Sequence, residues 1–207
     1  MGAKYLEVVK RGSHPNKRVY LPNGTLSQLL HESTMLLGYQ PDWPARLSIA
    51  IGVAKDFKPL IGDIEISEFL DSIKGSTMII PYVGSSVYVP PEYAYTMRVT
   101  EPGNAYSFGV ILLEILTTRT SVDEAFGEGL DLVKWVHGAA ARGETPEQIL
   151  DARLSSVSID WRRQMLAALK VALLCTDCRP AKRPKMMNIV GMLREIRNHK
   201  PHEFSVP

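Results

Sequence analysis

Two short stretches decide the fold of this chain: Tyr-Val-Pro-Pro-Glu-Tyr at residues 88–93 and Asn-Ala-Tyr-Ser-Phe-Gly-Val at residues 104–110. The second stretch opens a longer run, residues 105–117, that is apolar on nearly all sides. A surface helix carries one apolar stripe, whereas a helix that is apolar all round is buried. The run therefore predicts a helix at the centre of a core.

These stretches resemble two parts of a protein kinase. Pro90-Pro91-Glu92 resembles the A-P-E element that ends an activation segment, and residues 104–117 resemble the long central helix of the C-terminal lobe. Residues 130–136 and 181–186 match further motifs in the same order. Together they resemble the intracellular domain of plant leucine-rich-repeat receptor-like kinases. The resemblance implies a mainly α-helical, truncated kinase-like fold: a C-terminal lobe with a hinge remnant, without an N-terminal lobe or catalytic loop.

Composition and charge exclude some classes of function. With 207 residues the chain is long enough for one sizeable domain or two small ones. Its net charge of +2, with no basic run interleaved with aromatic residues, gives no indication of nucleic-acid binding. The longest apolar run, residues 108–116, is too short to span a bilayer and contains Glu114. We expect a soluble, cytoplasmic chain, although the resemblance implies that full-length relatives are plasma-membrane receptors.

The resemblance divides the chain unequally. Residues 1–19 match nothing and are expected to be poorly ordered. A partial kinase-like domain then occupies residues 20–198, and residues 199–207 form a tail. Within the domain the resemblance assigns a hinge and helix D to residues 20–33, helix E to 42–55, the activation segment to 63–92 and the C-lobe helices to 104–198.

Local signals predict where several helices begin. Residues 25–28 and Thr145 to Gln148 are capping boxes, and Asp42 is a candidate N-cap for helix E. Asn104 is a candidate N-cap for the central helix. Because the segments that pack on helix E in the family are missing, we expect this helix to expose apolar surface.

Most parts needed for phosphoryl transfer are absent from the sequence. A G-x-G-x-x-G loop does not occur: Gly127 and Gly129 begin one, but Leu132 stands at the third glycine. Lys55 follows Val-Ala as the catalytic lysine does, yet it ends a helix rather than lying on a strand. No histidine begins an H-R-D loop, and about two dozen residues are missing after helix E by comparison with the family's motif order. We therefore predict no catalytic residue and no cofactor, although the family uses ATP and Mg²⁺.

Three remnants of nucleotide chemistry are candidates for weaker roles. Tyr20 and Leu21 resemble the hinge and offer at most an adenine contact. Asp63, in the altered D-F-G element Asp-Ile-Glu, has the right ligand type for Mg²⁺, but a solvated loop carboxylate is the competing interpretation.

Other candidate residues concern structure and regulation. Glu92 and Arg183 resemble the ends of the ion pair that ties the activation segment to the last helices, and two unrelated surface charges are the alternative. Cys175 and Cys178 form C-x-x-C without a second ligand pair or a redox context, which predicts a structural role. The activation segment also carries three possible phosphosites, Ser72, Ser76 and Thr77.

Three hypotheses of function follow. The first is a catalytically inactive pseudokinase that binds proteins, with full-length receptor-like kinases or their regulators as partners. The second is an ATP-dependent protein kinase acting on Ser, Thr or Tyr in receptor-like signalling. The third is a non-functional product of a damaged or mis-spliced kinase gene. Fold resemblance alone does not carry activity, and the missing loops favour the first hypothesis over the second.

Overall fold

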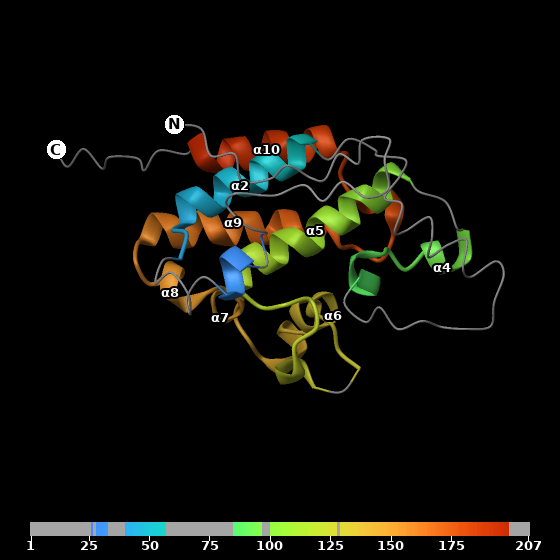
Figure 1. The fold of residues 1–207 in the computed structure, drawn as a ribbon, viewed down its shortest axis with the longest axis horizontal. Coiled ribbons are helices and arrows are strands. Elements are labelled where there is room, and N and C mark those ends of the chain that lie inside the picture. Colours follow the sequence, from blue (N-terminus) through green and yellow to red (C-terminus); the bar gives the residue numbers. More distant parts are fainter. Residues whose placement is uncertain are drawn as a thin grey trace, which may run out of the picture.

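The computed structural model describes residues 26, 28–32, 40–56, 85–96, 100–127 and 129–198. Within these ranges the structure is helical and contains no strand (Figure 1). The helices are η1 (Gln28–Glu32, a π-helix), α2 (Trp43–Asp56), α4 (Tyr93–Thr96), α5 (Glu101–Thr117), α6 (Leu132–His137), α7 (Pro146–Ile149), α8 (Ala152–Ser155), α9 (Ile159–Cys175) and α10 (Met186–Asn198). Short 3₁₀ turns are η2 (Ser85–Tyr88), η3 (Glu124–Phe126), η4 (Ala140–Arg142) and η5 (Pro180–Lys182).

Helix α5 forms the centre of the core, as its all-round apolar sequence predicts. Twelve of its seventeen residues are buried, so the helix has no solvent face of its own. Helix α9 packs against it (Figure 1). The two helices approach most closely at Gly109 among the glycines of α5 that face α9. A Cβ atom at Gly109 would stand 2.7 Å from side-chain atoms of both Cys175 and Thr176, so only glycine permits this approach.

The start of α5 corrects a prediction from the sequence. The N-cap is Thr100, whose hydroxyl oxygen accepts a 3.1 Å hydrogen bond from the Gly103 amide, and the helix begins at Glu101. Pro102 fits the first turn because its missing N–H would have no helical partner there. The prediction that Asn104 caps this helix is wrong, because the proline-containing turn before it is already helical.

Helix α2 occupies the range in which the sequence predicts helix E. Asp42 caps it, since its Oδ1 accepts a 2.9 Å hydrogen bond from the Ala45 amide. The helix packs against α10 and α5. We expected apolar surface on this helix, and that expectation is wrong: its large apolar side chains are 6% exposed or less. These side chains are Trp43, Leu47, Ile49, Ile51 and Val53.

The last two long helices complete the core, each through one apolar face. Met165 and Leu169 of α9, and Ile189 and Leu193 of α10, are at most 2% exposed. Between α5 and α9 the chain folds into short pieces around α6, which lies below the long helices in Figure 1. The capping box at Thr145 is formed, but it opens a helix of only four residues.

Candidate functional site

An ion pair ties the segment before α5 to the segment before α10. Arg183 donates from Nη1 to Glu92 Oε1 at 2.6 Å and from Nη2 to Oε2 at 2.9 Å. This two-point contact matches the planar guanidinium fork to the carboxylate. The Arg183 side chain has no solvent exposure, whereas that of Glu92 is 18% exposed. The two residues proposed from the motifs, 91 positions apart, are therefore brought into contact.

Further contacts fix Arg183 in this position. Its Nε donates to the Asp177 carbonyl at 2.8 Å, and Nη1 also donates to the Pro102 carbonyl at 3.1 Å. Its guanidinium carbon lies 4.9 Å from the centre of the Tyr106 ring, a cation–π distance. Burial raises the pKa of Tyr106 to about 12, and the negative charge of Asp131 acts in the same direction. The positive charge of Arg183 acts against this shift but is the weaker influence. Arg183 thus joins η5 to α4 and to the first turns of α5.

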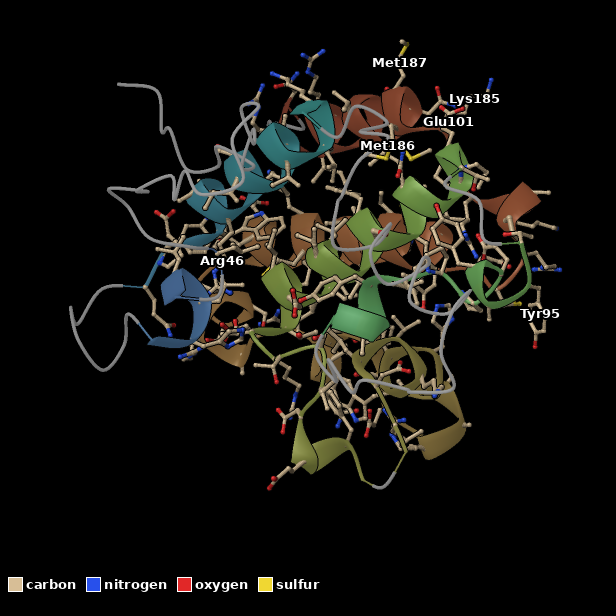
Figure 2. The ribbon with its side chains drawn as sticks, turned by 45° about the vertical axis from the view of Figure 1, so that its right-hand side comes forward. Arg46, Tyr95, Glu101, Lys185, Met186 and Met187 are labelled. Carbon is tan, nitrogen blue, oxygen red and sulfur yellow. The ribbon has the colours of Figure 1, made fainter. Side chains whose placement is uncertain are left out.

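The residue after Glu92 closes the turn that leads into α5. The Tyr93 hydroxyl accepts a 2.9 Å hydrogen bond from the Thr100 amide, next to the helix start. Any Cβ at Gly103 would collide with the Tyr93 ring, so glycine is required where the ring crosses the helix. In contrast, Tyr95 on the same short helix is 89% exposed and points away from the molecule (Figure 2).

A second polar contact holds η2 on α5. The Tyr88 hydroxyl donates to Glu114 Oε1 at 2.7 Å, and the Ser121 amide donates to the same oxygen at 3.0 Å. The Ser107 hydroxyl donates to the Tyr88 carbonyl at 2.7 Å. Burial raises the pKa of the Glu114 carboxyl even though both hydrogen bonds oppose this, and burial beside Glu114 also raises the pKa of Tyr88. Glu114 is 8% exposed and has no ion-pair partner within the described ranges.

Comparison with known proteins places this geometry in a family. The sequence is 58% identical over 205 residues to the leucine-rich repeat receptor-like tyrosine-protein kinase PXC3 of Arabidopsis thaliana, covering 87% of this chain and 23% of PXC3. Over most of its length the chain is similar to leucine-rich-repeat receptor-like kinases. The receptor-like protein kinase TDR of the same plant is 32% identical, over 86% of this chain and 19% of TDR. No family model matches the chain.

A solved structure confirms the truncated kinase-like fold. The pseudokinase domain of BIR2, described as an immune regulator of the RLK/Pelle family, matches with a TM-score of 0.63 and 25% sequence identity. The match covers 90% of this chain but 61% of the BIR2 chain. By length, the chain spans about a fifth of the curated receptor-like kinases that it matches. Among the described residues, no helix is long and apolar enough to cross a membrane.

Several kinase-derived candidates fall outside the described residues. These are the hinge residues Tyr20 and Leu21, the candidate metal ligand Asp63 and the possible phosphosites Ser72, Ser76 and Thr77. Within the ranges that the structure describes, no three His, Cys, Asp or Glu side chains gather closely enough to hold a metal ion. Cys175 is buried and Cys178 is exposed, and neither forms a disulfide. Burial raises the pKa of the Cys175 thiol to about 12, which keeps it protonated and suits a structural role.

Asn104 lies in the first turns of α5 and is half-buried. Its Nδ2 atom is buried and has no hydrogen-bond partner among the residues that the structure describes. An unpaired buried donor costs stability, since its bond to water is lost without replacement.

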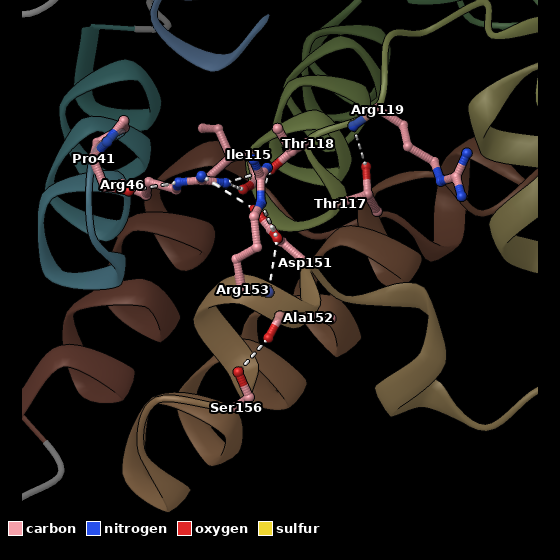
Figure 3. A network of polar contacts seen from close by, with 10 residues as sticks. All are labelled: Pro41, Arg46, Ile115, Thr117, Thr118, Arg119, Asp151, Ala152, Arg153 and Ser156. Atoms are coloured by element: carbon pink, nitrogen blue, oxygen red, sulfur yellow. Dashed lines mark hydrogen bonds and ion pairs between the residues drawn. The ribbon is translucent and has the colours of Figure 1, made fainter. Parts of the chain in front are cut away.

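A second buried arginine, Arg46 of α2, is not predicted from the motifs. Arg46 is 1% exposed and donates to the Pro41 and Ile115 carbonyls at 3.0 Å each and to Thr118 Oγ1 at 2.6 Å (Figure 3). Its Nη2 lies 3.3 Å from Asp151 Oδ2. A signal was present, because Arg46 stands four residues before Ala50 and so shares the buried face of α2.

Asp151 is the centre of this Arg46 network. It accepts from the Thr118 hydroxyl at 2.7 Å and from Arg153 Nε and Nη2 at 2.9 and 3.0 Å (Figure 3). Burial pushes the pKa of Asp151 upward, but the contacts with Arg153, Thr118 and Arg46 outweigh it and leave the pKa below its ordinary value. Thr118 holds a left-handed backbone, with φ of 56°, where α5 ends. The network thus joins α2, the end of α5 and the start of α8.

Proposed function

We propose that this chain is a catalytically inactive pseudokinase that acts by binding other proteins. The observation that carries the proposal is internal to the sequence. Between the end of α2 at Asp56 and the Pro-Pro-Glu element at residues 90–92 there is no H-R-D-x-x-x-x-N loop. That loop positions the attacking hydroxyl and holds a metal ion, and catalysis of phosphoryl transfer is mainly positioning and charge stabilisation.

The framework around the missing loop supports a binding role. Arg183 and Glu92 keep their two-point contact, and Tyr88 stays fixed to Glu114. These contacts organise the lobe but carry out no chemistry. In addition, the buried amide nitrogen of Asn104 has no hydrogen-bond partner within the described ranges. A lobe that keeps its scaffold without its catalytic parts can still present surfaces to partners.

The family itself suggests the class of partner. We propose full-length receptor-like kinases or their regulators as partners, met at the cytoplasmic side of the plasma membrane. BIR2 supports this reasoning, since its domain is a pseudokinase and BIR2 is described as an immune regulator. The segment with Ser72, Ser76 and Thr77 would then be phosphorylated in trans. We propose that this causes no switch within the chain, because the arginine that usually pairs with such a phosphate belongs to the missing loop.

A nucleotide experiment tests the proposal. We expect no saturable thermal shift on titration with magnesium and ATP, and no transfer of radiolabelled phosphate above a mock-purified control. The family resemblance supplies the matched variant: Asp63→Ala removes the one carboxylate of the altered D-F-G element that has the family's metal-binding position. A saturable shift at micromolar ATP, or transfer that Asp63→Ala abolishes, would overturn the proposal.

The same experiment decides the alternative, an ATP-dependent protein kinase. One observation favours it, namely 58% identity to a protein named a receptor-like tyrosine-protein kinase. For the binding role, the intracellular domain of that relative can be immobilised and the chain passed over it. We expect saturable binding without nucleotide, and binding that requires ATP would favour the enzyme instead.

A further inference from the structure

Four tyrosines lie among the described residues, and three of them have side chains that hold the fold together. The Tyr88 hydroxyl donates to Glu114 Oε1 at 2.7 Å. Tyr93 is 3% exposed, and its hydroxyl accepts a 2.9 Å hydrogen bond from a backbone amide next to the start of α5. Tyr106 is 7% exposed and lies under the guanidinium of Arg183. These three side chains can receive a new group only when the lobe opens.

Tyr95 differs from the other three. It is 89% exposed and points away from the molecule (Figure 2). Its side chain makes no hydrogen bond with any residue that the structure describes. The neighbouring Ala94 and Thr96 are exposed as well. The Tyr95 hydroxyl is therefore not used by the described part of the fold, and a reagent as large as another protein can reach it.

The segment around Tyr95 can be drawn out without uncovering the core. Helix α4 has four residues, and a helix of that length is marginal by itself. The amides of Tyr95 and Thr96 both donate to the Glu92 carbonyl, at 3.1 and 2.9 Å, and the Thr96 hydroxyl donates to it at 3.0 Å. Opening residues 94–96 breaks these bonds but exposes no buried side chain, because Tyr93 stays in place as the anchor. Local openings that uncover little apolar surface cost the least free energy.

The charge around Tyr95 also allows a negative group to be added. A phosphate placed next to unpaired acidic residues disrupts a structure by repulsion. Glu92, three residues before Tyr95, is paired through both of its oxygens with Arg183. Since Tyr95 projects into solvent, a phosphate on it would also keep its hydration. The added charge should therefore leave the lobe folded.

We propose that the fold makes Tyr95 a phosphorylation site, which a protein tyrosine kinase modifies while the lobe stays folded. The Tyr95 phenolic oxygen bonds to the γ-phosphorus of ATP, the bond from that phosphorus to ADP breaks, and the phenolic proton passes to the base of the kinase. In-line attack needs a hydroxyl that can enter the active site of the kinase, and among the four described tyrosines Tyr95 offers it. The inference rests on the proposed function in one respect, because an inactive chain must receive this phosphate from another kinase.

Site-resolved mass spectrometry of the full chain tests the proposal. The chain is incubated with Mg²⁺, ATP and a soluble protein tyrosine kinase of broad sequence preference, and phosphate at each tyrosine is followed from early times. We expect Tyr95 to gain phosphate faster than Tyr88, Tyr93 and Tyr106 by about tenfold or more, because those three become accessible only when the lobe opens. Equal rates at Tyr95 and at any of the three would overturn the proposal.

An unfolded control separates exposure from sequence preference. A synthetic peptide of residues 86–98 carries Tyr88, Tyr93 and Tyr95 without the lobe. The three should be phosphorylated at comparable rates in this peptide. If the preference for Tyr95 persists unchanged there, the sequence and not the fold selects it, and the proposal fails. In the full chain with Tyr95→Phe, Tyr93 should stay unmodified, and phosphate appearing on Tyr93 at the rate first seen at Tyr95 would contradict the argument from burial.

Thermal melts test whether the lobe stays folded after modification. We expect the phosphorylated chain to melt within about 2 °C of the unmodified chain, because changes at an exposed side chain without partners have small effects on stability. A larger fall in Tm would show that the phosphate disturbs the lobe, and it would overturn the proposal.

Incubation with ATP but without the added kinase separates this inference from the proposed function. Phosphate on Tyr95 in that sample, and not in a mock-purified control, would overturn the inactive-pseudokinase proposal and would support Tyr95 as the acceptor. If Tyr95 does not accept phosphate from the added kinase, this inference fails and the inactive-pseudokinase proposal stands.

Discussion

The two buried arginines among the described residues, Arg183 and Arg46, satisfy their buried charge in different ways. Arg183 meets one carboxylate, Glu92, through both arms of its fork. Arg46 spreads its donors over two carbonyls, a hydroxyl and one oxygen of Asp151. Among the described residues, Arg183 is the one cation paired with Glu92, whereas Asp151 is also held by Arg153 and Thr118. The comparison shows that the importance of a buried carboxylate depends on the number of its partners. Loss of Asp151 affects several donors at once, whereas loss of Glu92 affects Arg183.

The largest loss of unfolding free energy is expected when Asp151 is replaced. Asp151→Ala would leave Arg46, which is 1% exposed, without its carboxylate and would also remove the cap of α8. Removing one member of a buried pair costs about 3–5 kcal/mol in unfolding free energy. Denaturant melts measure this cost. Arg153→Ala is the matched control: its side chain is 53% exposed, so we expect a loss below about 1 kcal/mol. Similar losses for both variants would contradict the buried role of Arg46.

A smaller effect is expected at the two-point pair. Arg183→Met should cost about 2–3 kcal/mol, less than a fully buried pair, because Glu92 retains partial access to water. The double variant with Glu92→Gln should cost less than the sum of the single variants. A double-mutant cycle from denaturant melts gives the coupling. Strict additivity would show that the two side chains do not interact in solution.

Two buried acidic residues, Asp151 and Glu114, have pKa values shifted in opposite directions, so their contributions to stability should respond oppositely to pH. The lowered pKa of Asp151 contributes stability that is present at neutral pH and is lost as pH falls through its folded pKa. The raised pKa of Glu114 acts oppositely: its ionisation opposes folding, so stability falls as pH rises above its unfolded value. Glu114→Gln keeps the oxygen that accepts from Tyr88 and Ser121.

We therefore expect the Glu114→Gln variant to match the unaltered chain near pH 4 and to be more stable at pH 7, by less than about 1.5 kcal/mol. Thermal melts between pH 4 and pH 8 measure the difference. A variant that is less stable at pH 7 would show that the negative charge of Glu114 is needed in the folded state.

The smallest effect is expected at Asn104, whose buried amide nitrogen has no hydrogen-bond partner among the described residues. Replacing it by alanine removes a buried, unpaired amide and adds a better helix former. We expect a gain in unfolding free energy of about 0.5–1 kcal/mol. A loss of stability in the melt would mean that the amide has a partner in solution, in contrast to its position in the structure.

The sequence motifs are sufficient to predict the Glu92–Arg183 pair, because each residue lies in a recognisable element. They do not predict the Arg46–Asp151 contact, since neither residue belongs to such an element and the two stand 105 positions apart. Asn104 shows the opposite case. Its residue type suggests a helix cap, yet Thr100 and Pro102 have already started the helix. The nucleotide-site candidates, Asp63 among them, lie outside the described residues and stay predictions.

The sequence by itself determined the features that depend on near neighbours. The all-round apolar run made α5 central, and the cap at Asp42 set the start of α2. Only the tertiary structure decided which distant groups meet: Arg46 reaches Ile115, Thr118 and Asp151, and α9 approaches α5 at Gly109. The physical reason is the sequence distance over which each interaction acts. Capping and periodicity act within a few residues, whereas the partner of a buried charge is set by how whole helices pack.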